Sequence, residues 1–417
     1  MTEHVYTLGI FLLRALYRVA GWINPKAQKF RKGRKDQEKI LKTTFPLPSS
    51  DVLVWFHCSS LGEFEQGRPI IEALKGWKPG LKILLTFFSP SGYEVRKNYE
   101  HADYIFYLPW DTRGNAQWFA ETVRPNLAIF VKYEFWYHYS QALKNRNIPL
   151  ISTSTILRPE QNFFKPYGSF FRSILKNFQF FFAQNQASVD LLKGIGITSV
   201  ALTGDTRFDR VNQIVKNRSE NSIAFHFKNR KKVMVIGSAW PEDMAVLIPF
   251  INKHLSHLKF IIAPHEIQES FLQSIEKSVK GVTLRHSSPD VLQRGVNADV
   301  LLIDNIGLLS QLYGYGEYAF VGGAYKDGLH NILEAACFGI PIFFGDKFYR
   351  KFQEANDLIV RGGAFAIRNG AHLDSAFAKL EGTPSAYQEA CRTTQAYVQE
   401  NLGATEKITE YCKKILG

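Results

Sequence analysis

The sequence predicts an α/β protein made of two doubly wound domains, and three observations lead to that prediction. Short apolar runs of strand length alternate with helical patterns along most of the chain, as in strand–helix–strand units. Polar or glycine-rich turns follow many of these runs, at the positions where parallel strands present their carboxyl ends to ligands. The length of 417 residues suits two hydrophobic cores better than one.

The first α/β series occupies residues 51–210 and predicts an N-terminal domain. Its expected strands are residues 52–56, 83–87, 104–108, 127–131, 150–152, 180–183 and 199–202. After the first strand, residues 61–63 read as a tight turn, and a helix continues over residues 69–75. The helical patterns between the strands give this series its doubly wound character.

The second α/β series occupies residues 233–383 and predicts a C-terminal domain. Its expected strands are residues 233–237, 259–263, 282–284, 300–303, 318–321 and 340–344. The polar and basic stretch between the two series, residues 211–232, has no strong apolar period and predicts a domain linker. Residues 384–417 predict a C-terminal helical segment that can cross back to the first domain.

Residues 1–35 predict a membrane-anchoring helix with a basic flank. Residues 5–23 are apolar and almost long enough to span a bilayer, but Arg14 and Arg18 lie one turn apart on one helical face. The cations of the flank are Lys26, Lys29, Arg31, Lys32, Arg34 and Lys35. We expect this helix to bind the anionic cytoplasmic leaflet, because its Tyr, Trp and Arg residues suit the interface. A soluble docking helix with a solvated charged tail is the alternative, and whether an anchor spans or lies in the membrane stays open.

Composition points to a soluble globular body with an acidic partner. Hydrophobic residues make up 45% of the chain, and the mean hydropathy is −0.16. The net charge of +13 favours a phosphorylated substrate or an anionic membrane, and the absence of aromatic–basic stripes argues against nucleic acid. The four cysteines, Cys58, Cys337, Cys391 and Cys412, have no disulfide or metal-ligand spacing. We therefore expect free thiols, no metal site and no cofactor.

The segment 318–345 is the strongest candidate for a phosphate site. Gly322 and Gly323 follow an apolar strand, and a bare strand end lets a ligand approach the backbone. A helix is expected over about residues 331–338, beginning beside His330 and Asn331 and carrying Glu334 in its first turn. Such a helix start offers free N–H groups to phosphate. The Glu334 carboxylate suits a ribose diol, although it can also serve only the helix dipole.

Other turns supply candidate side chains at the strand ends. In the second domain these are Ser238, Pro264, His265 and the turn 305–307. Glu63, after the first strand, can act as a general base on a hydroxyl or can merely complement a helix dipole.

Two further candidates in the first domain have competing explanations. Arg207 can screen the charge of a departing phosphate or can pair with Asp205 or Asp209. His57 and Cys58 suggest a nucleophile, but no third partner is evident, which favours a buried structural cysteine.

Taken in order, the motifs resemble those of the 3-deoxy-D-manno-octulosonic acid (Kdo) transferases of lipopolysaccharide and lipid A biosynthesis. The resemblance covers nearly the whole chain. It rests on an apolar helix with a basic flank and then on HCSSLGE, LTFFSPSGYE, YLPWDTRGN, RPNLAIFVKYEFW, LTGDTRFD, APHE, LLIDNIGLLSQLY and FVGGAYKDGLHNILEAACFGIPIFFG.

The resemblance implies a GT-B fold, in which two Rossmann-like domains face each other across a cleft. It implies metal-independent transfer of Kdo from CMP-Kdo to a hydroxyl of the lipid A precursor (lipid IVA) at the inner membrane. Glu63 is then the catalytic base, and Arg207 stands where the family places a transition-state lysine. The implied CMP-binding residues are Pro264, His265, Ile306, Gly307, Leu308, Asn331 and Glu334. Candidates for the acceptor site or the cleft are Glu134, Ser238, Gly322, Gly323 and His330.

Several positions depart from the family pattern. Lys132 replaces the first acid of Glu-x-Glu and is retained as a catalytic candidate, while Glu134 keeps the second acid. Leu308 replaces a Glu, His265 and Glu266 replace Arg-His, and Leu329 replaces a Gly. These changes indicate a divergent branch of the family.

Two other functional classes stay open at this point. One is a GT-B glycosyltransferase or a sugar epimerase that uses a nucleotide-diphosphate sugar, and the other is a non-catalytic basic adaptor. The number of Kdo units, the acylation of the acceptor and the oligomeric state do not follow from the sequence.

Overall fold

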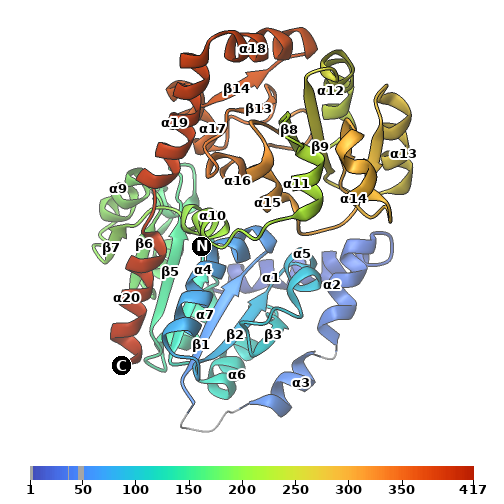
Figure 1. The fold of residues 1–417 in the computed structure, drawn as a ribbon. Helices are drawn as coiled ribbons and strands as arrows, with labels where there is room; N and C mark the ends of the chain where they lie inside the picture. The colour runs from blue at the N-terminus through green and yellow to red at the C-terminus, as the bar shows by residue number, and fades with distance from the viewer. Residues whose placement is uncertain (1–2, 36, 46–50) are drawn as a thin grey trace. The chain divides into compact units, whose positions relative to one another are not determined.

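The computed structural model describes residues 3–35, 37–45 and 51–417, and it divides into two compact units (Figure 1). Unit 1 comprises residues 1–209 together with residues 402–417, and unit 2 comprises residues 210–401. Each unit contains one seven-stranded sheet whose described strand pairs all run parallel. The predicted α/β class with two parallel sheets is therefore confirmed.

In unit 1 the strand order is β3-β2-β1-β4-β5-β6-β7. The strands are β1 (Leu53–Cys58), β2 (Lys82–Phe87), β3 (Tyr104–Tyr107), β4 (Leu127–Val131), β5 (Leu150–Thr155), β6 (Phe180–Ala183) and β7 (Val200–Leu202). The direction of strand addition reverses between β1 and β4, which pair with Phe56 opposite Ile129. Ligands of open α/β sheets bind beyond the carboxyl ends of strands at such a reversal.

Both faces of this sheet are buried. On β1, Trp55 packs with Phe119 and Phe130 on one face, while Phe56 belongs to a second core with Phe64 on the other face. The continuous apolar runs read in the sequence are what a parallel sheet covered on both sides requires. The strand-end loops are consequently held by a rigid base.

The helices of unit 1 cover these two faces and the carboxyl edge. They are α1 (Glu3–Ala20), α2 (Pro25–Lys35), α3 (Gln37–Thr44), α4 (Leu61–Trp77), α5 (Pro90–Arg96), α6 (Arg113–Val123), α7 (Tyr137–Lys144), η1 (Asn162–Phe164), α8 (Ser169–Leu175), α9 (Gln186–Gly194) and α20 (Ala404–Leu416). A further helix, α10 (Thr206–Lys216), begins in unit 1 and continues into unit 2.

The expected N-terminal helix exists as α1, and one of its faces docks onto unit 1. The Tyr6 hydroxyl donates to Asp111 Oδ2 at 2.6 Å, Thr7 Oγ1 lies 2.9 Å from His138 Nε2, and Tyr17 stacks on Phe30. Within residues 3–35, 37–45 and 51–417, no helix combines the length and the apolarity needed to cross a membrane. Anchoring by α1 therefore stays a prediction. The Lys26 and Lys35 side chains of the basic flank lie outside the described part.

In unit 2 the strand order is β10-β11-β9-β8-β12-β13-β14, and the reversal falls between β8 and β12. The strands are β8 (Lys232–Ala239), β9 (Leu258–Pro264), β10 (Thr283–Arg285), β11 (Val300–Leu302), β12 (Tyr318–Val321), β13 (Ile342–Gly345) and β14 (Ala364–Ile367). The sequence did not predict β14. Its four residues form an edge strand that pairs with β13 alone among the described strands.

The remaining helices all belong to unit 2. They are α11 (Ser222–Lys228), α12 (Pro241–His254), α13 (Glu269–Ser278), α14 (Val291–Arg294), η2 (Gly295–Asn297), α15 (Leu309–Leu312), η3 (Tyr313–Tyr315), α16 (Leu333–Ala336), α17 (Gln353–Arg361), α18 (Gly370–Gly382) and α19 (Pro384–Glu400).

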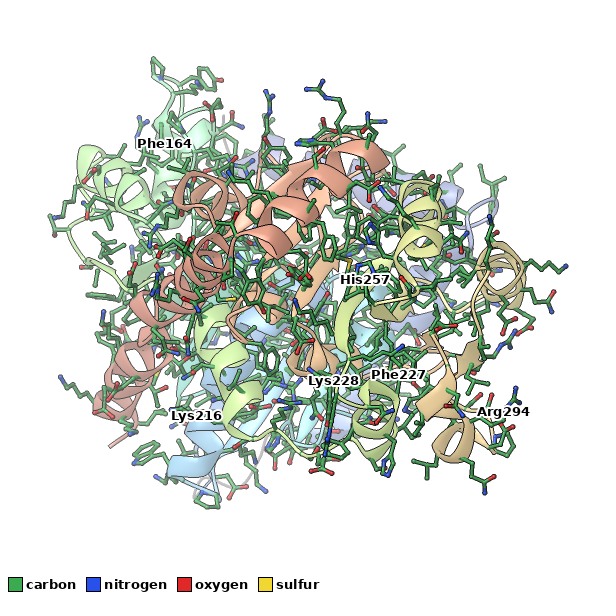
Figure 2. All side chains as sticks on the ribbon, turned by 45° about the horizontal axis from the view of Figure 1, so that its top comes forward. Phe164, Lys216, Phe227, Lys228, His257 and Arg294 are labelled. Atoms are coloured by element: carbon green, nitrogen blue, oxygen red, sulfur yellow. The ribbon has the colours of Figure 1, made fainter. Side chains whose placement is uncertain are left out.

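The structure differs from the sequence prediction in the expected linker, residues 211–232. This stretch contains the end of α10 and all of α11, on which Phe227 and Lys228 are neighbours (Figure 2). Phe227 is buried, and Lys228 Nζ forms an ion pair with Glu317. Within α11 only Ala224 and Phe227 are buried, so the apolar pattern is too short to appear as a helical period.

The C-terminal segment is helical and divides between the units. Helix α19 belongs to unit 2, whereas α20 packs against α4 in unit 1 and buries Ile408 and Cys412. The Asp209 carboxylate accepts the backbone N–H groups of Gly403 and Thr405, each at 2.7 Å. The chain thus leaves unit 1 and returns to it at the same place.

Candidate active site

Glu63 lies in the first turn of α4, directly after β1. Ser60 is the N-cap of α4, and its backbone N–H donates to Glu63 Oε2 at 2.9 Å while its hydroxyl bonds to the same oxygen. The expectation of a tight turn over residues 61–63 was wrong, because the Ser60–Glu63 capping box starts the helix there. The carboxylate nevertheless stands at the carboxyl end of β1, beside the reversal of strand order.

A buried polar cluster lies beside Glu63 at the ends of β1, β2 and β4. His57 Nδ1 is 2.9 Å from Thr86 Oγ1, and His57 Nε2 is 3.1 Å from Glu134 Oε2. The Trp136 indole N–H also donates to Glu134 Oε2 at 2.7 Å. His57 therefore has the partners that the sequence did not reveal. Burial raises the pKa of the neighbouring Cys58 thiol well above its usual value, which makes Cys58 an inert core residue.

The two candidate cations of unit 1, Lys132 and Arg207, are positioned by hydrogen bonds and an ion pair within this unit. Lys132 follows β4 with a positive φ of 73°, and its backbone N–H donates to Thr153 O at 2.8 Å. The Arg207 guanidinium forms an ion pair with Asp205 at 2.8 Å, and the Arg207 backbone N–H donates to the same carboxylate. The pairing of Arg207 with Asp205 is thus observed, and a role of Arg207 toward phosphate stays a prediction.

In unit 2 the candidate residues gather around a stack of three rings at the ends of β8, β9 and β12. His265 stacks between Trp240 and His330, with ring centroids 4.4 and 4.3 Å apart. The Trp240 indole N–H donates to His330 Nε2 at 3.1 Å. Burial, with a smaller effect of His265, lowers the pKa of His330 to about 4, so its ring is neutral at physiological pH.

The Asp243 carboxylate binds backbone groups next to this stack. Its Oδ2 accepts the backbone N–H groups of Trp240 and Gly323, both at 2.9 Å. Its Oδ1 is buried and has no hydrogen-bond partner among the described residues. Burial raises the pKa of Asp243 to about 6.

The two glycines after β12 serve internal packing. A Cβ on Gly322 would lie 2.3 Å from Ser238 O and 2.7 Å from Asp243 Oδ2. A Cβ on Gly323 would lie 2.4 Å from Gly328 O, and its φ of 96° also favours glycine. The space beside this strand end, which the sequence suggested for a ligand, is thus occupied by Ser238, Asp243 and Gly328.

The helix expected over residues 331–338 is shorter than predicted. Helix α16 has four residues, and the chain continues in tight turns to Gly339, whose φ is 67°, and then Pro341. The Leu333 backbone N–H donates a hydrogen bond to Asn331 Oδ1 at 3.3 Å, and Asn331 Nδ2 donates one to Glu334 Oε1 at 3.1 Å. What remains for a ligand is a positioned Asn331–Glu334 pair beside a single helical turn.

The turn 306–308 follows β11, which pairs with β9, the strand that ends before His265. The Ile306 side chain is 92% exposed, Gly307 has a φ of 98°, and Leu308 caps the four-residue helix α15. This turn follows β11, which is two strands away from β8 in the sheet.

The sequence did not single out four residues of the two clusters, Thr86, Trp136, Trp240 and Asp243. One available signal was Trp240-Pro241-Glu242-Asp243 directly after β8, since Pro at the first helical position with acids in the first turn marks a helix start. The His57 cluster has no comparable signal, because its members come from β1, β2 and the loop after β4, which are distant in the sequence.

Solved structures with the same architecture define the class of fold. UDP-GlcNAc 2-epimerase from Neisseria meningitidis matches with a TM-score of 0.60 and 18% identity, covering 87% of this chain and 100% of that one. MurG of Acinetobacter baumannii matches with a TM-score of 0.54 and 11% identity, covering 87% and 99%. The protein therefore has a GT-B-like fold.

The sequence comparisons point to one family of enzymes. Residues 27–210 match the family described as 3-deoxy-D-manno-octulosonic-acid transferase (kdotransferase). The 3-deoxy-D-manno-octulosonic acid transferase of Aquifex aeolicus is 29% identical over 354 residues, covering 82% of this chain and 91% of the relative. The enzyme of the same name from Rickettsia prowazekii is 25% identical over 366 residues, covering 85% and 77%. The resemblance to the Kdo transferases is confirmed, and with the fold it supports a Kdo glycosyltransferase.

Proposed function

We propose that the protein transfers Kdo from CMP-Kdo to a hydroxyl of the lipid A precursor, without a metal ion and with Glu63 as general base. The observation that carries the proposal is the position of Glu63, at the carboxyl end of β1 in a domain that matches the Kdo transferase family. Attack of the acceptor hydroxyl on the anomeric carbon of Kdo forms the glycosidic bond and releases CMP. The hydroxyl must lose its proton as it attacks, which requires a base.

The capping contacts of Glu63 are compatible with this role. Both bonds from Ser60 end on Oε2, and Oε1 has no hydrogen-bond partner among the described residues. Ser60 thereby fixes the carboxylate by one oxygen and leaves the other to accept a proton. Capping and catalysis are compatible functions of the same side chain.

The donor site is proposed at the strand ends of unit 2. The Asn331–Glu334 pair is suited to a ribose diol, since the carboxylate accepts from hydroxyl groups and the amide holds its orientation. Pro264, His265, His330 and the turn 306–308 are the proposed remaining contacts with CMP, while Ser238 stays a candidate for the site. Arg207 and Lys132 are the proposed cations for the charge that grows on the departing phosphate.

The first test exchanges Glu63 for Gln. Gln can still accept the Ser60 N–H, so the helix start is retained, but it cannot accept a proton. We expect Glu63→Gln to lower kcat by about 10²- to 10⁴-fold, the usual contribution of a positioned general base. Affinity for CMP should not change. Mass spectrometry of the lipid product would also count the Kdo units added.

Glu65→Gln is the matched control for this test. Glu65 lies on the same helix, but its carboxylate pairs with Arg96. A folded Glu63→Gln variant that keeps wild-type turnover would falsify the assignment of the base.

The second test concerns the donor and compares CMP with UDP by calorimetry. A Kdo transferase should prefer CMP, whereas tighter binding of UDP would favour the alternative of a nucleotide-diphosphate sugar enzyme. Glu334→Ala should weaken CMP binding by about 1–3 kcal/mol, as expected for lost hydrogen bonds to a charged group. The surface substitution Glu389→Ala in α19 is the control. Unchanged CMP affinity in Glu334→Ala would reject the ribose role.

A further inference from the structure

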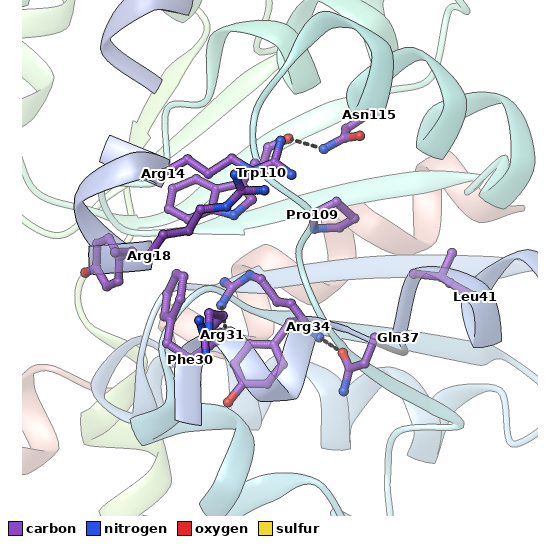
Figure 3. Close-up of a pocket in the computed structure, with 12 residues that line it drawn as sticks. Arg14, Arg18, Phe30, Arg31, Arg34, Gln37, Leu41, Pro109, Trp110 and Asn115 are labelled. Carbon is purple, nitrogen blue, oxygen red and sulfur yellow. Dashed lines mark hydrogen bonds between the residues drawn. The ribbon is translucent and has the colours of Figure 1, made fainter. Parts of the chain in front are cut away.

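A cavity of about 340 Å³ lies in unit 1 between α1, α2 and the loop that follows β3 (Figure 3). Its lining includes Arg14 and Arg18 from α1, Arg31 and Arg34 from α2, and Trp110 from the loop. We call this cavity the arginine pocket. Among the residues that the structure describes, the lining of this pocket includes no carboxylate.

The cations of the arginine pocket are not neutralised within the protein. None of its four arginines forms an ion pair with an acid in the described part of the chain. Elsewhere in the same unit, Arg68 and Arg96 both pair with Glu65. Four like charges around one cavity repel one another, so the pocket is electrostatically suited to an anion.

Arg34 lines the pocket, and its hydrogen-bond partners among the described residues are all neutral. Its guanidinium donates to Phe88 O at 2.5 Å and to Leu108 O at 3.4 Å, and it lies 3.6 Å from the centroid of the Phe30 ring. Burial lowers the pKa of Arg34 to about 9, which leaves it charged at neutral pH. A fixed cation with only neutral partners interacts strongly with an entering anion, because little water screens it.

The walls of the pocket are aromatic. The Trp110 ring lies 5.8 Å from the Tyr17 ring and 5.5 Å from the Phe30 ring, in edge-on or tilted arrangements. Aromatic walls with a few polar groups are typical of sites that bind small organic ligands rather than bare ions. The chemistry therefore suits a phosphate ester on a ring-shaped carrier such as a sugar.

A chain of contacts joins the pocket to the cluster beside Glu63. The Phe88 ring contacts both Trp110, at 5.6 Å, and Trp136, at 5.1 Å, and Trp136 donates to Glu134. Phe88 directly follows β2, so the pocket lies at the same carboxyl edge of the sheet as Glu63.

We propose that the arginine pocket binds the phosphate of a phosphorylated amino-sugar lipid, the acceptor of the transfer reaction. This inference rests on the proposed function for the identity of the acceptor, while the phosphate site itself stands on the geometry above. Helix α1 carries Arg14 and Arg18 toward the pocket and exposes Leu8, Leu12 and Leu16 elsewhere on its surface. A lipid whose head group enters the pocket therefore remains beside an apolar surface.

The direct test measures binding of soluble probes to the full chain by calorimetry or NMR titration. The probes are glucosamine 1-phosphate, glucosamine, and glycerol 1-phosphate as the head group of an ordinary phospholipid. Glucosamine 1-phosphate should bind more tightly than both others. The variants R14Q/R18Q and R31Q remove cations from the two helices separately, and each should weaken its binding by roughly 10- to 100-fold.

The matched control is K144Q/K193Q, which removes two exposed cations on α7 and α9 outside the pocket. It should bind the phosphosugar as the wild type does. Equal losses in control and pocket variants would show diffuse attraction and overturn the inference. Equal binding of glucosamine would overturn the phosphate site, and equal binding of glycerol 1-phosphate would assign the pocket to membrane phospholipid instead.

The transfer reaction separates this inference from the proposed function. The pocket variants should raise KM for the lipid acceptor without changing KM for CMP-Kdo. Wild-type acceptor KM in variants that are folded and active overturns the inference and leaves the proposed function intact. If the wild type transfers no Kdo but binds glucosamine 1-phosphate through these arginines, the proposed function fails and the phosphosugar site stands.

Discussion

Glu63 shows how one side chain can satisfy a structural rule and still be available for chemistry. The sequence left two explanations open for it, a general base and a helix-capping residue. The structure shows the cap, since Ser60 binds Oε2, and Oε1 has no hydrogen-bond partner among the described residues. Glu134 is a weaker candidate for the base, because it is only 8% exposed and is already bonded to His57 and Trp136.

His330 gives a testable dependence of stability on pH. Its pKa in the folded protein is about 4, below the usual 6.5 of histidine, so between these values the unfolded chain binds the proton more readily. Wild-type stability should therefore fall as the pH drops from about 7 towards 4, by at most about 1.4 kcal/mol per pH unit. In His330→Gln, the free energy of unfolding should fall less over this pH range, because the histidine that takes up the proton is absent.

Urea unfolding of the wild type and His330→Gln between pH 7.5 and 4.5 provides the measurement. The raised pKa of Asp243 acts in the opposite direction, but it is present in both proteins and cancels in the difference. His101→Gln, on the surface of unit 1, controls for the loss of a histidine as such. Parallel pH profiles for the wild type and His330→Gln would contradict the assignment.

At this scale the sequence located residues better than it described their surroundings. It placed Glu63 and His265 in the turns after strands, and His330 and Glu334 at a helix start, because polar residues after apolar runs mark the carboxyl edge of a sheet. It missed the partners of His57, since Thr86 and Glu134 are distant in the sequence and meet only through strand order. Tertiary contacts of this kind leave no local pattern to read.

Among the elements, β12 and the two glycines that follow it shape the proposed donor site. A Gly322→Ala methyl group would meet the Ser238 carbonyl oxygen, which is backbone and cannot move without disturbing β8. We expect this substitution to cost about 1–3 kcal/mol of unfolding free energy, as overpacking in a rigid core does. Thermal or urea unfolding measures the change.

Gly382→Ala is the matched control in the same unit. Gly382 is the last residue of α18, and a Cβ there would meet nothing within 4 Å. It should be neutral or stabilising by up to about 1 kcal/mol, because alanine is the better helix former. Equal stability of Gly322→Ala and the wild type would show that the loop can relax around the added methyl group.

Strands were easier to predict than short helices. Residues 127–131 and 318–321 coincide with β4 and β12, because strands buried on both faces are continuous apolar runs. The helix over residues 331–338 was overestimated, since Gly339 and Pro341 force tight turns after Ala336. Helix α11 was missed for the opposite reason, as its buried face is too short to show a period.

At the scale of the whole molecule, the exposed face of α1 bears on where the protein works. Leu8, Leu12 and Leu16 are 59%, 58% and 66% exposed and recur every four residues, while the opposite side of the helix docks on unit 1. We propose that this face lies in the surface of an anionic inner membrane on its cytoplasmic side. Deleting α1 would be an unsuitable test, because it would also remove the Tyr6 contact with buried Asp111.

The suitable test leaves α1 docked and changes only its exposed face. L8Q/L12Q/L16Q should weaken sedimentation with phosphatidylglycerol vesicles by roughly tenfold or more, through loss of buried apolar area. The control replaces three exposed apolar residues elsewhere, Val95, Leu292 and Val360, with Gln. Undiminished vesicle binding by the α1 variant would remove the basis for an anchor.

The two-sheet architecture could be predicted from the sequence because strand-like runs and helical patterns alternate repeatedly along the chain. Two series of strand-like runs separated by a polar stretch predict two sheets, and the structure has two seven-stranded sheets. For the C-terminal segment, the sequence predicted only that it can cross back to the first domain. The contacts that hold it there, such as Asp209 with Gly403, depend on the fold.

The return of the chain to unit 1 has a consequence for biosynthesis. A ribosome makes the N-terminal part first, yet this unit lacks α20 until the codons for residues 402–417 have been translated. Until then the surface of α4 that α20 covers is exposed, and the Asp209 carboxylate lacks its two N–H donors. A premature stop codon that removes only α20 would therefore leave unit 1 incomplete, although unit 1 contains the residues synthesised first. Chaperones and proteases could then bind its exposed surface. Unit 1 can therefore be complete only after the ribosome has translated the codons for α20.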